Sequence, residues 1–218
     1  MPDAVVFDLD GVLVDSEQRW DDARRAVVAA ADREFPERAT RAMQGMSAPE
    51  WEAYLHDELR VPGPPAAIGR AVVDAMAAGY REDLPLLPGA VEAVRALADA
   101  YPLAVASSAN RELIELALDL AGIADRFRAV VSSEEVRRGK PAPDVYLEAA
   151  RRIAVDPARC AAVEDSSNGL RSAAAAGMAV IAVPNAAFPP ADDALALARA
   201  TVATVAEVTP ALVAKLDA

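Results

Sequence analysis

Two carboxylates follow the first apolar run of the chain. The run 4–8 is short and rich in β-branched residues, which predicts a buried strand that ends at Asp8, and Asp10 stands two positions further on. In open α/β sheets, ligands bind outside the carboxyl ends of the strands. Two carboxylates this close repel each other, and a divalent cation would relieve the cost of burying them. An Asp-x-Asp pair alone is a weak signal, so its interpretation depends on the other strand ends.

A second polar segment follows the apolar run 103–106. Ser107, Ser108 and Ala109 stand between that run and a helical stretch. A hydroxyl and free backbone N–H groups at the start of a helix can hold a phosphate group. An ordinary helix N-cap has the same composition, so this segment supports a phosphate site only together with the others.

Two further segments complete the set. The run 160–163 leads directly into Glu164 and Asp165, which adds two carboxylates at the same predicted sheet edge. Lys140 stands in a proline-rich loop before another helix, where a solvated lysine is the alternative. Clustered carboxylates suit Mg²⁺, which prefers oxygen ligands, and a hydroxyl, N–H groups and one fixed positive charge suit a phosphate group. We therefore expect a site for a hard cation and a phosphate.

Alternating strands and helices must position these residues. Short apolar runs predict buried strands, and the longer stretches between them predict helices, an order typical of a parallel sheet covered on both faces. The expected strands are 4–8, 103–106, 129–131, 160–163 and 179–183, and the expected helices are 89–100, 111–121, 143–154, 167–176 and 210–217.

Residues 16–82 interrupt this order, because no convincing strand occurs in them. Ser47 with Glu50 forms a capping box that predicts the start of a helix, and the proline-rich stretch 61–65 separates two helices. We interpret 16–82 as an all-helical domain inserted after the first strand of a core made of 1–15 and 83–218.

The composition excludes several classes of function. The chain has 218 residues, with 34 Asp and Glu against 22 Lys and Arg, which gives a formal net charge of −12. A chain this acidic is a poor candidate for binding nucleic acid or an anionic membrane through a general basic surface, and an anionic substrate needs a local cation. The single cysteine, Cys160, excludes an internal disulfide and a cysteine-rich zinc site. No apolar run approaches the roughly 18 residues of a membrane span, and the acidic start differs from a signal peptide.

The motifs resemble those of one known family. Residues 7–17, which read FDLDGVLVDSE, resemble the opening signature of the haloacid dehalogenase-like hydrolase superfamily. Ser107, Lys140 with Pro141, and the stretch 164–169 (EDSSNG) match its other motifs in order and spacing. The resemblance covers nearly the whole chain and implies an α/β fold, with a Rossmann-like parallel sheet core and an all-helical cap inserted after the first strand. Within the superfamily, the chain is most similar to sugar-phosphate phosphatases and β-phosphoglucomutase-like enzymes.

The resemblance implies catalytic roles for two residues, and a third residue joins them as a metal ligand. Asp8 is the nucleophile that becomes an aspartyl-phosphate. Asp10 is the general acid for the leaving alkoxide and then the base for water. The implied cofactor is Mg²⁺, bound by the carboxylates of Asp8 and Asp165 and by the main-chain carbonyl of Asp10.

Other residues are implied to support these three. Glu164 would hold metal-bound waters, while Ser107 and Lys140, with the Ser108–Ala109 backbone, would hold the phosphoryl oxygens. For Asn168, a water-mediated role at the metal and simple capping of the following helix remain equally open.

The helical domain decides the substrate. β-Phosphoglucomutase-like enzymes carry a histidine where this chain has Trp20, and a basic residue where it has Ala48 after Gly45-Met46-Ser47. Both departures favour a phosphatase over a mutase, which stays the alternative. The candidate contacts to the leaving group are Trp20, Arg24 and Gln44, and a place in the core of the helical domain is the alternative for Trp20.

A signalling module is the remote alternative. A phosphoacceptor receiver domain also gathers carboxylates, a serine and a lysine at a sheet edge, but it needs no insert and no general acid. We expect instead a cytoplasmic, monomeric phosphatase of a small phosphorylated metabolite, with no nucleic acid or membrane as partner.

Overall fold

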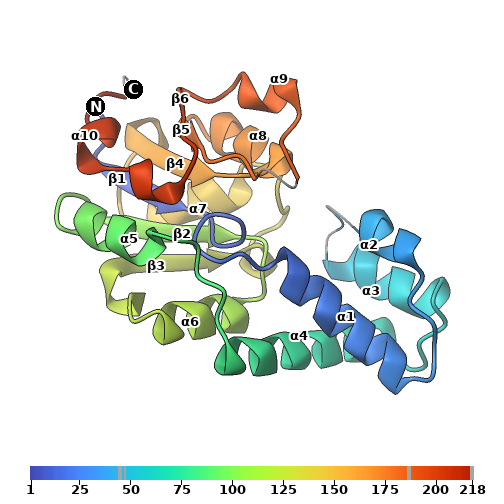
Figure 1. The fold of residues 1–218 in the computed structure, drawn as a ribbon. Coiled ribbons are helices and arrows are strands. Elements are labelled where there is room, and N and C mark those ends of the chain that lie inside the picture. The colour runs from blue at the N-terminus through green and yellow to red at the C-terminus, as the bar shows by residue number, and fades with distance from the viewer. Residues whose placement is uncertain (44–45, 47, 186–187, 217–218) are drawn as a thin grey trace. The chain divides into compact units, whose positions relative to one another are not determined.

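The computed structural model describes the chain except residues 44–45, 47, 186–187 and 217–218. The chain divides into two compact units, shown in Figure 1. The sheet unit is Met1–Asp15 with Pro85–Ala218, and the helical unit is Ser16–Leu84.

The sheet unit is built on a parallel sheet in the order β3-β2-β1-β4-β5-β6. Strands β1, β2, β4 and β5 are buried along their whole length, which is why the sequence shows them as continuous apolar runs. The expected α/β class is thus confirmed. The strands are β1 (Ala4–Phe7), β2 (Leu103–Ser107), β3 (Phe127–Ser132), β4 (Cys160–Glu164), β5 (Ala179–Ala182) and β6 (Ala200–Thr201).

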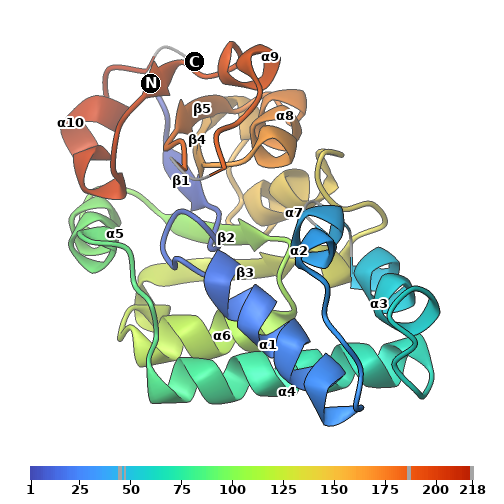
Figure 2. The same ribbon diagram turned by 45° about the vertical axis from the view of Figure 1, so that its right-hand side comes forward.

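Helices cover both faces of this sheet (Figures 1 and 2). Helices α7 and α8 pack on one face over the alternate residues Val6, Ala104 and Val131, while α5 and α6 lie on the other face. The strand order runs outward from β1 to β3 and then returns to β4. Crossovers between parallel strands are almost always right-handed, which places the helices before and after this return on opposite faces. The helices are α5 (Ala90–Ala98), α6 (Arg111–Leu120), α7 (Asp144–Arg152), α8 (Ser167–Ala175), α9 (Asp192–Leu195) and α10 (Pro210–Val213), with 3₁₀ turns η1 (Ala124–Arg126), η2 (Ser133–Glu135), η3 (Pro157–Arg159) and η4 (Val205–Glu207).

Two details near the C-terminus differ from expectation. Strand β6 was not expected, because two residues are too short to show a periodic pattern. The helix expected over 210–217 ends at Val213, so that prediction was too long. Thr209 caps its first turn, and the chain then turns and buries Leu216.

The strand order places a switch point at β1. From β1 the chain builds β2 and β3 on one side and later β4, β5 and β6 on the other. Ligands bind at the carboxyl edge of such a switch. The backbone N–H of Asp8 donates to the carbonyl of Val163 at 3.0 Å, which ties the end of β1 to the end of β4.

The helical unit consists, in the residues described, of helices and the turns between them. Helix α4 forms its centre, with a buried face that includes Ile68, Val72 and Met76 and that packs on α1 and α3. The expected break at 61–65 lies between α3 and α4, whereas Ser47 of the expected capping box lies outside the described residues. The helices are α1 (Glu17–Ala30), α2 (Glu37–Met43), α3 (Ala48–Asp57) and α4 (Pro65–Glu82). Among the described helices of the whole chain, none is long and apolar enough to cross a membrane.

Candidate active site

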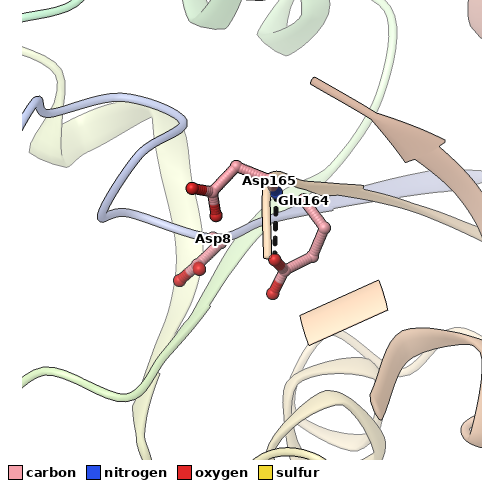
Figure 3. Close-up of side chains that lie close together, drawn as sticks. All are labelled: Asp8, Glu164 and Asp165. Atoms are coloured by element: carbon pink, nitrogen blue, oxygen red, sulfur yellow. Dashed lines mark hydrogen bonds between the residues drawn. The ribbon is translucent and has the colours of Figure 1, made fainter. Parts of the chain in front are cut away.

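Three carboxylates meet where β1 and β4 end. Asp8 directly follows β1, Glu164 is the last residue of β4, and Asp165 follows it. Because Phe7 pairs with Val163 in parallel register, the next residues of the two strands lie side by side. Their ligand atoms lie within 4.8 Å of one another, and Figure 3 shows the three side chains close together. The expected cluster at this sheet edge is therefore formed.

Lys140 joins this cluster as its positive charge. Its Nζ atom lies 3.0 Å from Oδ1 of Asp8 and 2.6 Å from Oε1 of Glu164. Only 4% of the Lys140 side chain is exposed, so it is not a solvated loop lysine. Burial lowers the pKa of the Lys140 ammonium, but Asp8 and Glu164 raise it by more, so the group stays charged.

Both oxygens of Glu164 are occupied by hydrogen bonds. Oε1 accepts from Lys140 at 2.6 Å and from the hydroxyl of Tyr146 at 2.8 Å. Oε2 accepts from the backbone N–H of Asp165 at 3.0 Å and from the N–H and hydroxyl of Ser166, both at 3.2 Å. A carboxylate has about four lone-pair sites, and five donors already fill them. Glu164 therefore orients its neighbours, and its expected contact with metal-bound waters stays a prediction. Oδ1 of Asp8 accepts from Lys140 and from the N–H of Leu9, so Oδ2 of Asp8 and the Asp165 carboxylate are the oxygens left for a ligand.

Tyr146 is a site residue that the sequence did not reveal. It lies on α7, is fully buried, and places its ring 5.1 Å from Lys140 Nζ. Burial and the charges of Glu164 and Asp8 raise the pKa of its hydroxyl well above the usual value, so it remains a donor. On the apolar face of a helix, a tyrosine has the pattern of an ordinary core residue. The available signal was its hydroxyl, which needs a buried acceptor.

The charges of the cluster fit a divalent cation. Burial is the largest cause that raises the pKa values of Asp8 and Asp165, and the neighbouring carboxylates add to it. If all ionise, the three carboxylates and the Lys140 ammonium leave a net charge of −2 in a buried place. Oxygen donors with excess negative charge are what Mg²⁺ prefers, so the donor set fits this ion.

Two glycines make room for the carboxylates. Gly11 has φ +74, and a Cβ there would collide with the carboxylate of Asp165. Gly169 lies in the first turn of α8, where a Cβ would collide with the carboxylate of Glu164. Both positions therefore require glycine for close approach to acidic side chains.

The expected phosphate segment lies at the end of β2. Ser107 is buried, and its hydroxyl donates to Oδ2 of Asp10 at 3.4 Å and accepts from the N–H of Ala109 at 3.0 Å. Ser108 is exposed and Asp10 is half-buried. The structure thus brings Ser107 and Asp10 together. The N–H of Ala109 is bound to the Ser107 hydroxyl within the turn.

Ser166 and Asn168 lie at the start of α8. The Ser166 hydroxyl accepts from the N–H of Gly169 at 3.1 Å and so caps the helix. Asn168 is the second residue of α8 and is half-buried. The capping role belongs to Ser166, which leaves the side chain of Asn168 for other contacts.

The candidates in the helical unit form a group of their own. Trp20 on α1 and Trp51 on α3 have ring centroids 6.2 Å apart. The guanidinium of Arg24 lies 5.3 Å from each ring centroid. The third candidate, Gln44, lies outside the described residues.

Known proteins resemble the chain over most of its length. The family profile of haloacid dehalogenase-like hydrolases matches residues 2–177. Hexitol phosphatase B of Escherichia coli is 35% identical over 189 residues, which cover 83% of each chain. The fructose-1-phosphate phosphatase YqaB of Escherichia coli is 31% identical, over 82% of this chain and 95% of its own.

A solved structure agrees with these matches. The crystal structure of CbbY from Rhodobacter sphaeroides in complex with phosphate superimposes with a TM-score of 0.84 at 29% identity, over 95% of this chain and 96% of that one. With the profile spanning most of the chain and the sheet edge carrying the motif residues, the protein belongs to the haloacid dehalogenase-like hydrolase family.

Proposed function

We propose that this hydrolase is a Mg²⁺-dependent phosphatase of a small phosphorylated metabolite, acting through an aspartyl-phosphate on Asp8. One observation carries the proposal. The buried Lys140 ammonium is 3.0 Å from Asp8 at the sheet edge where Asp165 also lies. A carboxylate that must approach an anionic phosphate needs such a cation beside it.

Asp8 is the proposed nucleophile. One of its carboxylate oxygens forms a bond to phosphorus while the bond from phosphorus to the substrate oxygen breaks. Lys140 and the hydroxyl of Ser107 would hold the phosphoryl oxygens. Oδ1 of Asp8 also accepts from the N–H of Leu9 at 2.7 Å, which fixes the carboxylate in position.

Asp10 is the proposed general acid and base. Its carboxyl would give a proton to the leaving alkoxide, and its carboxylate would then take a proton from the water that hydrolyses the aspartyl-phosphate. Its Oδ2 lies within 3.4 Å of the Ser107 hydroxyl, beside the proposed phosphate position.

Mg²⁺ would be held by the carboxylates of Asp8 and Asp165 and the main-chain carbonyl of Asp10, where it supplies positive charge for the phosphoryl oxygens. Glu164 keeps Lys140 and the Asp165 backbone in place, and Asn168 is a further candidate contact at this metal.

We further propose that the substrate is a sugar or sugar-alcohol phosphate, and that the helical unit is a cap that contacts its leaving group. Two relatives, named hexitol phosphatase B and fructose-1-phosphate phosphatase, support this class. Trp20, Arg24 and Gln44 remain the candidate contacts in the cap. Action in the cytoplasm as a monomer also remains a prediction.

The test is phosphate release from a panel of phosphorylated metabolites and from p-nitrophenyl phosphate, with Mg²⁺ or EDTA. Asp8→Asn should abolish release, while the same change at exposed Asp119 on α6 should not. Activity that survives in Asp8→Asn, or after thorough chelation, would contradict the proposal. Conversion of β-glucose 1-phosphate to glucose 6-phosphate, followed by phosphorus NMR with a trace of bisphosphate, would show a mutase instead.

A further inference from the structure

Arg24 has an unusual environment for a cation. Its guanidinium lies over both indoles, Trp20 and Trp51, 5.3 Å from each centroid. Its Nε atom is buried and has no hydrogen-bond partner in the part of the chain that the structure describes. Stacking on aromatic rings supports the flat faces of a guanidinium but leaves its N–H donors unsatisfied.

A neighbouring acidic group on the same helix is already engaged. Asp21 accepts from Nε of Arg25 at 2.6 Å and from the hydroxyl of Thr40 at 2.6 Å. Arg25 also donates to Thr40 and stacks on Phe35, so it has the full set of contacts of a structural arginine. The charges of Glu17 and Asp21 act on the Arg24 guanidinium and raise its pKa, but among the described residues Arg24 has no ion pair of this kind. The two neighbouring arginines therefore differ in that only one is satisfied internally.

The missing partner of Arg24 has a definite chemistry. Burial lowers the pKa of its guanidinium, which remains a cation with five N–H donors and no acceptor. Arg24 as a whole is half-buried while Nε is enclosed, so the end of the guanidinium reaches the surface. Carboxylates and phosphates match this fork with paired, charge-assisted bonds, which are about twice as strong as bonds to a neutral hydroxyl.

We infer that Arg24, flanked by Trp20 and Trp51, binds a second anionic group of the substrate, a carboxylate or a second phosphate at the end that does not react. The inference rests on the proposed phosphatase function, in which the helical unit contacts the leaving group. It narrows the substrate class from phosphorylated sugars in general to those that carry a further negative charge.

Matched substrate pairs test this inference by kcat/KM. One pair is 6-phosphogluconate and D-glucitol 6-phosphate, which share a carbon skeleton and differ in a carboxylate against a hydroxymethyl group. The other is fructose 1,6-bisphosphate and fructose 1-phosphate. We expect the wild type to prefer the anionic member of at least one pair by roughly tenfold or more. Arg24→Met should remove that preference, and the control Arg25→Met should keep it.

A binding measurement tests the site without turnover. Trp20 and Trp51 are the only tryptophans of the chain, so their fluorescence reports on the surroundings of Arg24. In the Asp8→Asn background, the preferred anionic member should change this fluorescence at a concentration roughly tenfold or more below its neutral counterpart. This comparison needs no Arg24 variant, so it remains decisive if Arg24→Met fails to fold.

The outcomes separate the two proposals. A wild type that hydrolyses p-nitrophenyl phosphate but prefers no anionic member overturns the role of Arg24 and leaves the phosphatase function intact. Equal losses on both members of a pair in Arg24→Met would overturn it as well. A wild type that hydrolyses no phosphate ester at all overturns the function on which the inference rests.

Discussion

The hydroxyl of Tyr146 donates a 2.8 Å hydrogen bond to Oε1 of Glu164, the same oxygen that accepts from Lys140 at 2.6 Å. Tyr146 thus stabilises the buried ion pair of Lys140 and Glu164. Because Tyr146 is itself fully buried, it acts through Glu164 and not on a substrate. Glu164 transmits this support, because its other oxygen holds the backbone N–H of Asp165. Rigid support of this kind is what keeps reacting groups in productive geometry.

Tyr146→Phe should lower kcat by roughly tenfold with little change in KM, because the ring stays and only the donor to Glu164 is lost. The free energy of unfolding should fall by about 1 kcal/mol. The control is Tyr101→Phe, whose hydroxyl makes only a 3.5 Å bond to the carbonyl of Pro210. Steady-state kinetics and urea unfolding give both quantities. An unchanged kcat in Tyr146→Phe would show that the hydroxyl only fills space.

Gly11→Ala should weaken the apparent affinity for Mg²⁺ by roughly tenfold or more, because the added Cβ displaces the Asp165 carboxylate. Gly177→Ala is the matched control, since Gly177 also has positive φ (+82) but a Cβ added there would meet nothing within 4 Å. Both variants should lose about 1–2 kcal/mol of stability from the left-handed backbone. Titration of activity with Mg²⁺ separates them, and equal Mg²⁺ affinity in the two would contradict the account.

The stabilisation of the fold by Mg²⁺ should grow with pH. Burial raises the pKa values of Asp8 and Asp165 above the ordinary 3.8, so the folded chain favours their protonated forms. In EDTA, this contribution to stability is fully present below about pH 4 and is lost as the pH rises. Mg²⁺ binds the ionised carboxylates and should offset the loss. Thermal unfolding should show a larger Mg²⁺-induced rise in Tm at about pH 8 than at about pH 5. A larger rise at the lower pH would contradict this linkage.

Asp10→Asn should make the rate depend strongly on the leaving group. A sugar alkoxide needs a proton from Asp10, so release of phosphate from sugar phosphates should fall by roughly 10²–10⁴-fold. The 4-nitrophenolate ion leaves without a proton, so the first turnover of p-nitrophenyl phosphate should stay fast and the following steps should be slow. Stopped-flow absorbance measures this burst. A first turnover slowed equally for both leaving groups would exclude Asp10 as the acid.

The carboxylates and the lysine could be predicted because strand ends are visible in sequence. Apolar runs that stop at Asp8 and Glu164 mark the carboxyl edge of a parallel sheet. Residues that follow neighbouring strands meet at that edge, however the helices pack on the sheet. The fold class followed from the same alternation of strands and helices.

The remaining contacts depend on packing that no local pattern encodes. Tyr146 reaches Glu164 only because α7 packs on β1, β2 and β3 and so brings this side chain to the end of the neighbouring β4. Its position on the helix is that of a core residue. Trp20 and Arg24 are one helical turn apart and could be paired from sequence, whereas Trp51 joins them only through the packing of the helical unit. Helix α10 likewise ends at Val213, and the buried Leu216 lies beyond it, which no local pattern indicates.

The most direct test of the central claim is to locate the phosphoryl group during turnover. Asp10→Asn should be mixed with p-nitrophenyl phosphate and Mg²⁺, quenched in acid during the burst, and mapped by mass spectrometry. We expect about one phosphoryl group per chain on the peptide that contains Asp8, and conversion of residue 8 to homoserine by borohydride. A phosphoryl group on any other residue, or continued turnover with none on the enzyme, would contradict it.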